Sequence, residues 1–212
     1  MSRLRTWYGR AFFNFPPPEL GEGKRLLNLG CGKKPLEGFV NADYFVAPNP
    51  NAWRKRPQWM LDLRYPLNCD SDYWDGIFTE HVLEHVAFLD AKNLLKEIRR
   101  TLKKGGVLRI IVPDLQQIVI AYLEHKKTGK IPDAISSIVS NRNSNSAADI
   151  VDNLVYDWGH QSIWDSERLI SVLKEVGFSQ VQEVSFRVGK DARLLQDQKS
   201  REPGSLYVEA IR

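Results

Sequence analysis

Two glycines and two aspartates occur at spacings that suit a small-molecule site. The short run Leu27-Asn28-Leu29 leads directly into Gly30-Cys31-Gly32, a pattern typical of a buried strand that enters a tight turn. Asp43 and Asp62 each end a further strand-like run, and their carboxylates can accept hydrogen bonds from hydroxyl or amine groups. A simple turn and two capping aspartates would explain each feature singly. Their succession favours a ligand site beyond the carboxyl ends of strands in an open α/β sheet.

Histidines provide the candidates for acid–base chemistry. His160 lies between Trp158 and Trp164, and a neutral imidazole there could accept a proton at physiological pH. We take it as the first catalytic candidate, the alternative being that it ties its loop to the core. Asp114, which follows an apolar run, is the second candidate or else the N-cap of the next helix. His81 and His85 are four residues apart and would share one face of a helix.

Several segments together resemble the class I S-adenosylmethionine-dependent methyltransferases, in particular their small type-11-like group. The segment from Leu27 to Gly32 resembles the cofactor loop of that family, and the resemblance spans about residues 24–115. Later segments resemble its fourth strand, the stretch that follows it and the turn into its fifth strand: Trp74-Asp75-Gly76-Ile77-Phe78, Glu80-His81-Val82-Leu83-Glu84-His85-Val86 and Leu102-Lys103-Lys104-Gly105-Gly106.

The resemblance implies S-adenosylmethionine as the cofactor and assigns roles to single residues. Asp43 matches the carboxylate that binds the ribose, and Asp62-Leu63 matches the adenine-side pair. The implied cofactor-binding set is Asn28, Gly30, Cys31, Gly32, Asp43, Tyr44, Asp62, Leu63, Glu80 and His81. The order H-x-x-E-H over residues 81–85 is also found in inverted zinc proteases. Because the methyltransferase motif already accounts for this segment, we expect no metal site.

The sequence departs from the family pattern at three points. Asn28 stands where an acidic residue is usual, which weakens one expected contact with the cofactor amine. A third loop glycine is absent, with Lys33-Lys34-Pro35 in its place. Few residues separate Gly30 from Asp43, so we expect the first helix to be short or missing.

The remaining pattern alternates strands with helices. The expected helices cover residues 87–103, 114–126 and 165–176, with Gly105-Gly106 ending the first and Lys103 and Lys104 in its last turn. The expected strands cover residues 25–29, 39–43, 59–63, 74–79, 107–112, 181–188 and 205–211. This order predicts an α/β fold with a Rossmann-like, mostly parallel sheet, helices on both faces and a C-terminal antiparallel hairpin. We expect residues 1–23 to form an aromatic and basic extension or lid, residues 24–212 the methyltransferase domain, and residues 128–150 a variable insertion within it.

Composition limits the classes of partner. The chain has 212 residues, of which 42% are hydrophobic and 26% charged, and a formal charge of +4. These values suit a globular domain. No apolar run approaches the roughly 18 residues of a membrane helix, and two cysteines outside a C-x-x-C pair give no zinc or disulfide signature. We therefore expect a cytoplasmic protein without a membrane span.

The acceptor is predicted from a narrower resemblance. The loop with Pro35-Leu36-Glu37-Gly38, and residues 158–164, are similar to predicted methyltransferases of surface-polysaccharide biosynthesis. This implies a small-molecule or glycan acceptor, methylated on a hydroxyl of a sugar or glycolipid intermediate, and no nucleic acid. The alternatives are an RNA or protein methyltransferase and a non-catalytic protein that binds S-adenosylmethionine. An Asn-Pro-Pro-Tyr type amino-methylating motif is absent. The incomplete G-x-G-x-x-G disfavours a dinucleotide dehydrogenase.

Overall fold

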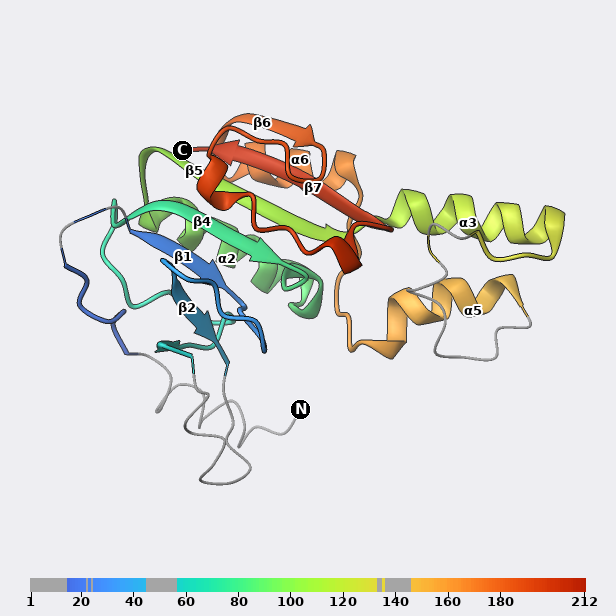
Figure 1. Cartoon of the computed structure of the whole chain (residues 1–212), viewed down its shortest axis with the longest axis horizontal. Helices are drawn as coiled ribbons and strands as arrows, with labels where there is room; N and C mark the ends of the chain where they lie inside the picture. The colour runs from blue at the N-terminus through green and yellow to red at the C-terminus, as the bar shows by residue number, and fades with distance from the viewer. Residues whose placement is uncertain (1–14, 22, 24, 45–56, 133–134, 136–145) are drawn as a thin grey trace, which may run out of the picture.

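A computed structural model describes residues 15–21, 23, 25–44, 57–132, 135 and 146–212. The strands of this part form one sheet in the order β3-β2-β1-β4-β5-β7-β6 (Figure 1). Strands β1 to β5 run parallel to one another, whereas β7 is antiparallel to both of its neighbours, β5 and β6. The strands are β1 (Leu26–Leu29), β2 (Val40–Asp43), β3 (Trp59–Met60), β4 (Trp74–Glu80), β5 (Leu102–Pro113), β6 (Ser179–Val184) and β7 (Ser205–Ile211). The predicted Rossmann-like, mostly parallel sheet is confirmed.

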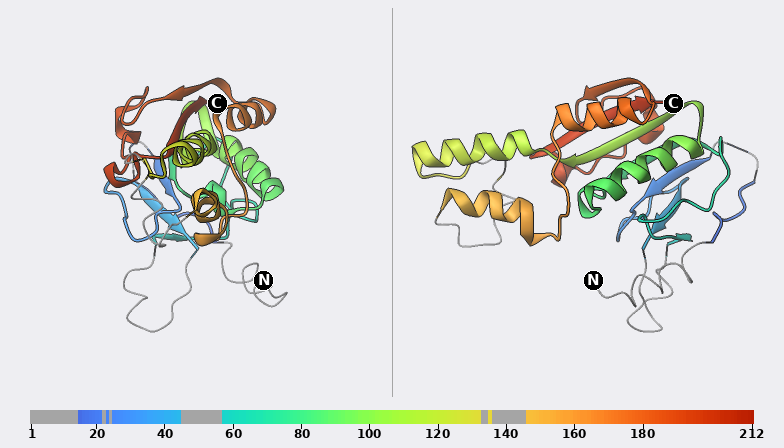
Figure 2. Two further views of the ribbon diagram at one scale, coloured as in Figure 1. Left: turned by 90° about the vertical axis from the view of Figure 1, so that its right-hand side faces the viewer. Right: turned by 180° about the vertical axis from the view of Figure 1, so that it is seen from behind.

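Two amphipathic helices cover one face of the sheet. In α2 (Phe88–Thr101) the buried side chains include Ala91, Leu94, Leu95 and Ile98, spaced by three or four residues, which is the period of a single helix face. In α6 (Ser166–Glu175) the N-cap Asp165 accepts a hydrogen bond from the Arg168 N–H. Both helices lie on the same face of the sheet (Figure 2). They join the inward side chains of β1, β4, β5 and β7 in the largest apolar cluster.

The opposite face has a different cover. Its cluster contains Leu26, Phe78 and Tyr207 from strands, together with Phe39 and Leu194 from connecting segments. Leu194 belongs to the short 3-10 turn η4 (Ala192–Leu194), and a second turn, η5 (Lys199–Arg201), follows it. The expectation of helices on both faces therefore holds for one face, while the described residues over the other are connecting segments with single 3-10 turns.

The start of β5 corrects one boundary. Helix α2 ends at Thr101, and its C-cap Leu102 already has extended backbone angles and pairs with Trp74 of β4. Lys103 and Lys104 therefore lie in β5 and not in the last helical turn. Lys103 donates from Nζ to Asp75 Oδ1 at 3.0 Å, so a cross-strand ion pair replaces the predicted contact with the helix dipole.

Other local predictions are confirmed. The chain from Gly30 to Phe39 contains no helix, so β1 and β2 are joined by turns alone. Gly177 ends α6 with a φ of +96°, a left-handed angle that favours glycine. The predicted strand 181–188 is shifted: β6 begins at Ser179, two residues before its predicted start, and ends at Val184, four residues before its predicted end.

Two helices project beyond the sheet. Helix α3 (Leu115–Thr128) extends β5, and α5 (Ala147–Asp152) continues through the π-helical turn η3 (Asn153–Asp157) (Figure 1). Side chains from both helices, including Ile118, Ala121, Ile150 and Leu154, form a separate apolar cluster. None of the helices in the described segments has the length and apolarity needed to cross a bilayer. Most of the predicted insertion, residues 133–134 and 136–145, lies outside the described residues.

The end of the predicted N-terminal extension contacts the domain. The Trp59 indole N–H donates to the Phe15 carbonyl at 2.8 Å, and Leu20 packs against the main apolar cluster. Residues 1–14 lie outside the described residues, so the predicted lid stays a prediction.

Candidate functional site

The glycine loop follows β1 and packs against the end of β4. Gly30 has a φ of +78°, and a Cβ there would meet Val82 Cγ2 at 2.1 Å. Gly32 has a φ of +53°, and a Cβ there would meet no atom within 4 Å. One side of the loop is therefore closed by Val82, while the backbone at Gly32 faces open space.

Asp43 links the end of β2 to this loop. Its Oδ2 accepts the Gly32 N–H at 2.6 Å, and its Oδ1 accepts the Tyr44 N–H at 2.6 Å. A carboxylate oxygen has two lone pairs, so each oxygen of Asp43 keeps one for a ligand hydroxyl. Burial raises the pKa of Asp43, while the two backbone hydrogen bonds and the nearby His85 lower it.

Asp62 follows β3 and is held by Arg64. Its Oδ1 accepts from the Arg64 backbone N–H at 3.1 Å and from Nε at 2.8 Å, and its Oδ2 pairs with the guanidinium. This arrangement leaves one lone pair on Oδ2. Asp62 is buried, and Leu63 packs against the main apolar cluster, so both residues are fixed where the third parallel strand ends.

Three further predicted cofactor residues surround the loop. The Asn28 side-chain amide donates to Asn41 Oδ1 at 2.8 Å within the sheet. The Asn41 amide also binds the Leu36 backbone. Asn28 thus fixes the segment after the loop. Cys31 is buried, whereas Tyr44 is exposed.

Glu80 is the last residue of β4, and its carboxylate accepts hydrogen bonds from a segment distant in sequence. Its Oε1 accepts the Gln198 backbone N–H at 2.9 Å, and its Oε2 accepts from Gln198 Nε2 at 2.6 Å. Lys34, just past the glycine loop, donates to Gln198 Oε1 at 2.6 Å. Gln198 therefore joins the loop to the end of β4, and neither it nor Lys34 was predicted.

His81 is held in one tautomer. Its Nε2 lies 2.9 Å from Ser205 Oγ, and the Ser205 hydroxyl donates its only proton to the Arg201 carbonyl. The hydroxyl must therefore accept a hydrogen bond from His81 Nε2–H. This leaves the lone pair on His81 Nδ1, which lies 3.7 Å from Glu84 Oε1.

His160 is fixed in a similar way. Its Nδ1 lies 2.5 Å from the Leu154 carbonyl oxygen, so this nitrogen must donate and Nε2 carries the lone pair. The His160 ring lies edge-on to the His85 ring, with centroids 4.9 Å apart. His85 Nε2 lies 3.9 Å from Glu84 Oε1. Ligand-type atoms of Glu84, His85 and His160 lie within 4.8 Å of one another, so three of the four histidines lie around Glu84.

Glu84 lies within the 3-10 turn η2 (Leu83–His85) after β4. It is 1% exposed, and both carboxylate oxygens lack a hydrogen-bond partner among the described residues. Burial raises its pKa to about 8. Burial also lowers the pKa of His81 to about 3, with Arg201 and the neighbouring histidines adding to the shift. The pKa values of His85 and His160 are lowered by burial as well, so all three imidazoles are neutral near pH 7.

Asp114 has a structural position. It is the N-cap of α3, where Oδ1 accepts the Gln116 N–H at 2.9 Å and Oδ2 accepts from Gln117 Nε2 at 3.1 Å. The capping interpretation of Asp114 is confirmed. Its catalytic role stays a prediction that this geometry does not support further.

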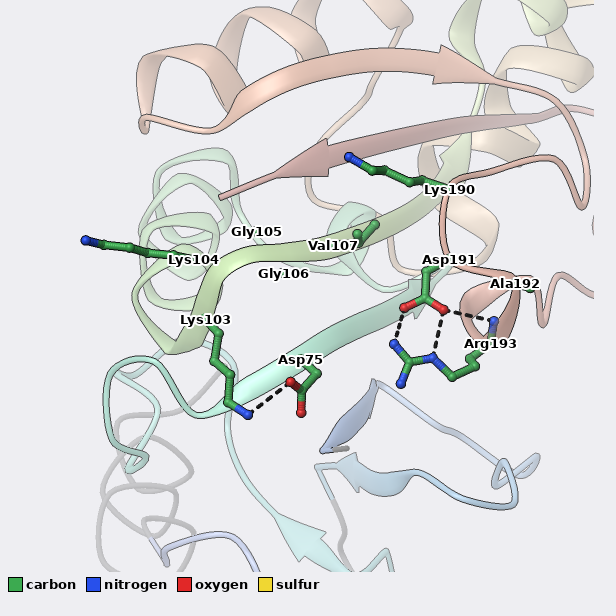
Figure 3. Close-up of a pocket in the computed structure, with 10 residues that line it drawn as sticks. All are labelled: Asp75, Lys103, Lys104, Gly105, Gly106, Val107, Lys190, Asp191, Ala192 and Arg193. Atoms are coloured by element: carbon green, nitrogen blue, oxygen red, sulfur yellow. Dashed lines mark hydrogen bonds and ion pairs between the residues drawn. The ribbon is translucent and has the colours of Figure 1, made fainter. Parts of the chain in front are cut away.

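A hollow of about 430 Å³ lies elsewhere, where β4 and β5 begin. Figure 3 shows its lining, in which Lys103 pairs with Asp75 and Arg193 pairs with Asp191. Lys104 and Lys190 also line it. Because the glycine loop and Asp43 lie where parallel strands end, this hollow is at the other edge of the sheet from the predicted site.

The sequence profile of a family described as "Methyltransferase domain" matches residues 3–183. The chain belongs to this methyltransferase family. The predicted enzyme class, a methyltransferase that uses S-adenosylmethionine, is thereby confirmed. No protein of curated function matches the chain.

Solved structures share the fold at low identity. A methyltransferase from Archaeoglobus fulgidus, described as S-adenosylmethionine-dependent, has 15% identity and a TM-score of 0.51, and the match covers 99% of this chain and 91% of that one. Another, from Mesorhizobium loti, has 18% identity and a TM-score of 0.51, with 92% and 93% covered. At this identity the likeness concerns the fold.

Proposed function

We propose that this methyltransferase methylates a hydroxyl of a sugar or glycolipid intermediate. The proposal draws on the sequence resemblance to enzymes of polysaccharide biosynthesis. It also rests on one observation, the group of neutral histidines and Glu84 at the end of β4. Glu84 and His85 follow β4, which pairs in parallel with β1, and β1 pairs in parallel with β2. The group therefore lies at the same edge of the sheet as Asp43, the ribose carboxylate we infer. An alcohol must lose its proton as it is methylated, and such a group can take it.

The cofactor residues we infer fit their ligand by hydrogen-bonding capacity. Asp43 keeps one lone pair on each oxygen for the two ribose hydroxyls, and Asp62 keeps one on Oδ2 for the adenine amine. The open space at Gly32 lets the ligand approach the backbone of the loop. Cys31, Tyr44 and Leu63 would complete the walls. Asn28 and Glu80 would act through the neighbours they fix, Asn41 and Gln198.

Bound S-adenosylmethionine supplies a methyl carbon activated by a positive sulfur. The chain must then align the acceptor oxygen, exclude water and receive the proton. His160 suits the last task, since its Nδ1–H is held by the Leu154 carbonyl and its Nε2 lone pair is free to accept. Its lowered pKa keeps this lone pair available at neutral pH.

The experiment is an acceptor screen with the full-length protein and S-adenosylmethionine. Nucleotide sugars, oligosaccharides and glycolipids form one arm, and RNA and peptides the other. We expect S-adenosylhomocysteine to form, and a methyl group to be gained, only in the carbohydrate arm. Methylation of RNA or peptide alone would overturn the proposed acceptor. If the Asp43→Ala variant still binds S-adenosylhomocysteine as tightly as the unchanged protein, the inferred cofactor site is wrong.

A further inference from the structure

Glu84, His85 and His160 present three ligand-type atoms to one small volume. One such atom from each residue lies within 4.8 Å of the others. Glu84 and His85 come from the turn η2 after β4, whereas His160 comes from the segment between η3 and α6. From the sequence, the H-x-x-E-H order over residues 81–85 is the one hint of a metal, and we expected no metal site. The fold brings a third histidine and an unpaired carboxylate to the same place.

The segments that carry these residues are tied together by backbone contacts. The Gln161 N–H donates to the Glu84 carbonyl at 2.7 Å, and the Ser162 N–H donates to the same carbonyl at 3.1 Å. The Gln161 side chain donates to the His85 carbonyl at 2.6 Å. These bonds fix the segment after His160 against the turn that holds Glu84, so the grouping does not depend on free surface side chains.

The outer hydrogen bonds of two histidines are those of metal ligands. A histidine that binds a metal usually donates its second ring N–H to a backbone carbonyl or another acceptor, which fixes the ring. His160 does so through the Leu154 carbonyl, and His81 does so through Ser205 Oγ. The other nitrogen of each ring carries the lone pair that could bind a metal: Nε2 in His160 and Nδ1 in His81.

The carboxylate of Glu84 lacks the partner that burial demands. A buried carboxyl group is costly to leave without a hydrogen bond, and its ionised form needs a cation or a metal as a partner. Both Glu84 oxygens are without hydrogen bonds in the described part of the chain. The Arg201 guanidinium acts on Glu84 electrostatically, but it donates to the Glu80 carbonyl at 3.2 Å.

We propose that Glu84, His85 and His160 bind one divalent transition-metal ion, with His81 Nδ1 as an adjacent fourth donor. Metal–ligand bonds of about 2.1 Å place tetrahedral ligand atoms roughly 3–4 Å apart. The Glu84 Oε1 distances of 3.7 Å to His81 Nδ1 and 3.9 Å to His85 Nε2 are already in this range. Small side-chain rotations would bring the wider pairs within it.

The donor set selects the class of ion. Imidazole nitrogens suit zinc, iron, nickel and copper, whereas magnesium and calcium prefer oxygen ligands and water. With one carboxylate and up to three imidazoles, the site fits a zinc-like ion. Such an ion would give a buried Glu84 a positive partner and leave a net charge of +1.

The role of the ion in methyl transfer rests on the proposed function. A hydroxyl bound to a divalent ion has a lowered pKa, so the acceptor would release its proton to solvent and keep its oxygen electron pair. That oxygen would bond to the methyl carbon while the carbon–sulfur bond breaks and its electron pair stays on sulfur. His160 would then be a metal ligand instead of the proton acceptor, because both roles use the Nε2 lone pair.

The test is calorimetric titration of chelator-stripped protein with Zn²⁺, and separately with Mg²⁺. We expect one Zn²⁺ per chain, binding at least tenfold weaker in Glu84→Gln and in His160→Ala. His125 lies on α3 outside the cluster, so His125→Ala is the matched control and should bind as the unchanged protein does. His85→Ala gives a second cluster variant at a 43% exposed side chain, which the fold should tolerate if Glu84→Gln proves unstable.

The outcomes separate this inference from the proposed function. Absence of stoichiometric Zn²⁺ binding, equal binding in the cluster variants, or equal affinity for Mg²⁺ would overturn the metal site. Titration of Glu84→Gln and His160→Ala with S-adenosylhomocysteine provides the second readout, and we expect the affinity to be unchanged because neither residue is assigned to the cofactor. Zinc binding with the cofactor site lost would leave the metal site standing and contradict the cofactor assignment alone.

Discussion

The Asp43 carboxylate accepts the backbone N–H of Gly32 at 2.6 Å. This bond joins the end of β2 to the loop after β1, so one side chain both shapes the glycine loop and faces the ligand. Two residues matched to the cofactor site separately are therefore one structural unit. Loss of the Asp43 charge should affect the loop and the ligand together.

The first prediction concerns this unit. Asp43→Asn keeps the size of the side chain but removes its charge. Its amide NH₂ group would then face the backbone N–H of either Gly32 or Tyr44, which is itself a donor. Hydrogen bonds to a charged group contribute about 1.5–3 kcal/mol, so we expect affinity for S-adenosylhomocysteine to fall about 10- to 100-fold. Calorimetric titration measures it. Asp70→Asn, an exposed carboxylate before β4, is the control, and equal affinity in both variants would contradict the role of Asp43.

The second prediction concerns the closed side of the loop. Gly30→Ala would place a methyl group 2.1 Å from Val82 Cγ2 at a φ of +78°. Overpacking costs about 1–3 kcal/mol and a left-handed non-glycine residue about 1–2 kcal/mol. We expect the free energy of unfolding in urea to fall by about 2–5 kcal/mol.

Gly129→Ala is the matched control for Gly30→Ala. Gly129 has a φ of +70°, and a Cβ there meets no atom within 4 Å. The Gly129→Ala variant should therefore lose only the free energy that a left-handed backbone costs a non-glycine residue, about 1–2 kcal/mol. If the two variants lose equal stability, the contact with Val82 has no energetic effect.

The strand ends were predictable because their pattern is local. Gly30 and Asp43 each follow a short apolar run, and parallel pairing brings the ends of such runs to one edge. The same reasoning misplaced Lys103 and Lys104, because a basic pair after an amphipathic helix is also typical of a last helical turn. The pairing of Leu102 with Trp74 decides the boundary, and nothing local indicates it.

The histidine group was beyond local patterns. The family resemblance implies a cofactor role for His81, and the flanking Trp158 and Trp164 single out His160 as a candidate base. The segment of His160 is held against Glu84 by the backbone bonds of Gln161 and Ser162, and His81 is fixed by Ser205, 124 residues away in sequence. Gln198 reaches Glu80 over 118 residues. Such contacts are set by the path of the C-terminal segment over the sheet, for which the sequence carries no short-range signal.

The third prediction concerns the buried ion pairs that anchor this segment. Arg109 of β5 is fully buried and donates to Asp197 Oδ1 at 2.6 Å and to Glu209 Oε1 at 3.1 Å. Arg109→Met would leave two buried carboxylates without their cation. Removing one partner of a buried pair costs about 3–5 kcal/mol, so we expect a loss of that size in urea unfolding. Hydrogen exchange at Gln198 should also accelerate, since it is the next residue after Asp197.

The control for Arg109→Met is Arg193→Met. Arg193 forms its ion pair with Asp191 at a side-chain exposure of 36%. Exposed pairs contribute about 0–1 kcal/mol, so we expect little change in stability. A loss in Arg109→Met as small as that in Arg193→Met would show that the buried pairs contribute little.

The fourth prediction concerns the Cys31 thiol in the glycine loop. Burial raises the pKa of Cys31 to about 11, with the nearby Asp43 adding to the shift. The thiolate is the reactive form, and two units above the ordinary value of 9.0 reduce its fraction at pH 8 about 100-fold. Iodoacetamide should therefore alkylate Cys31 at least tenfold more slowly in the native protein than in urea.

The same shift predicts how stability depends on pH. Because the folded pKa of Cys31 is raised, the contribution of its thiol to the free energy of unfolding is fully present below about pH 9 and is lost as the pH rises toward 11.

The alkylation rate must be measured for each cysteine separately. Cys69 also has a pKa raised to about 11, so Cys31→Ser is compared with Cys69→Ser. Native Cys69→Ser protein should alkylate slowly at its remaining Cys31. Fast alkylation there would show that the loop opens to solvent, and that the closure by Val82 does not persist in solution.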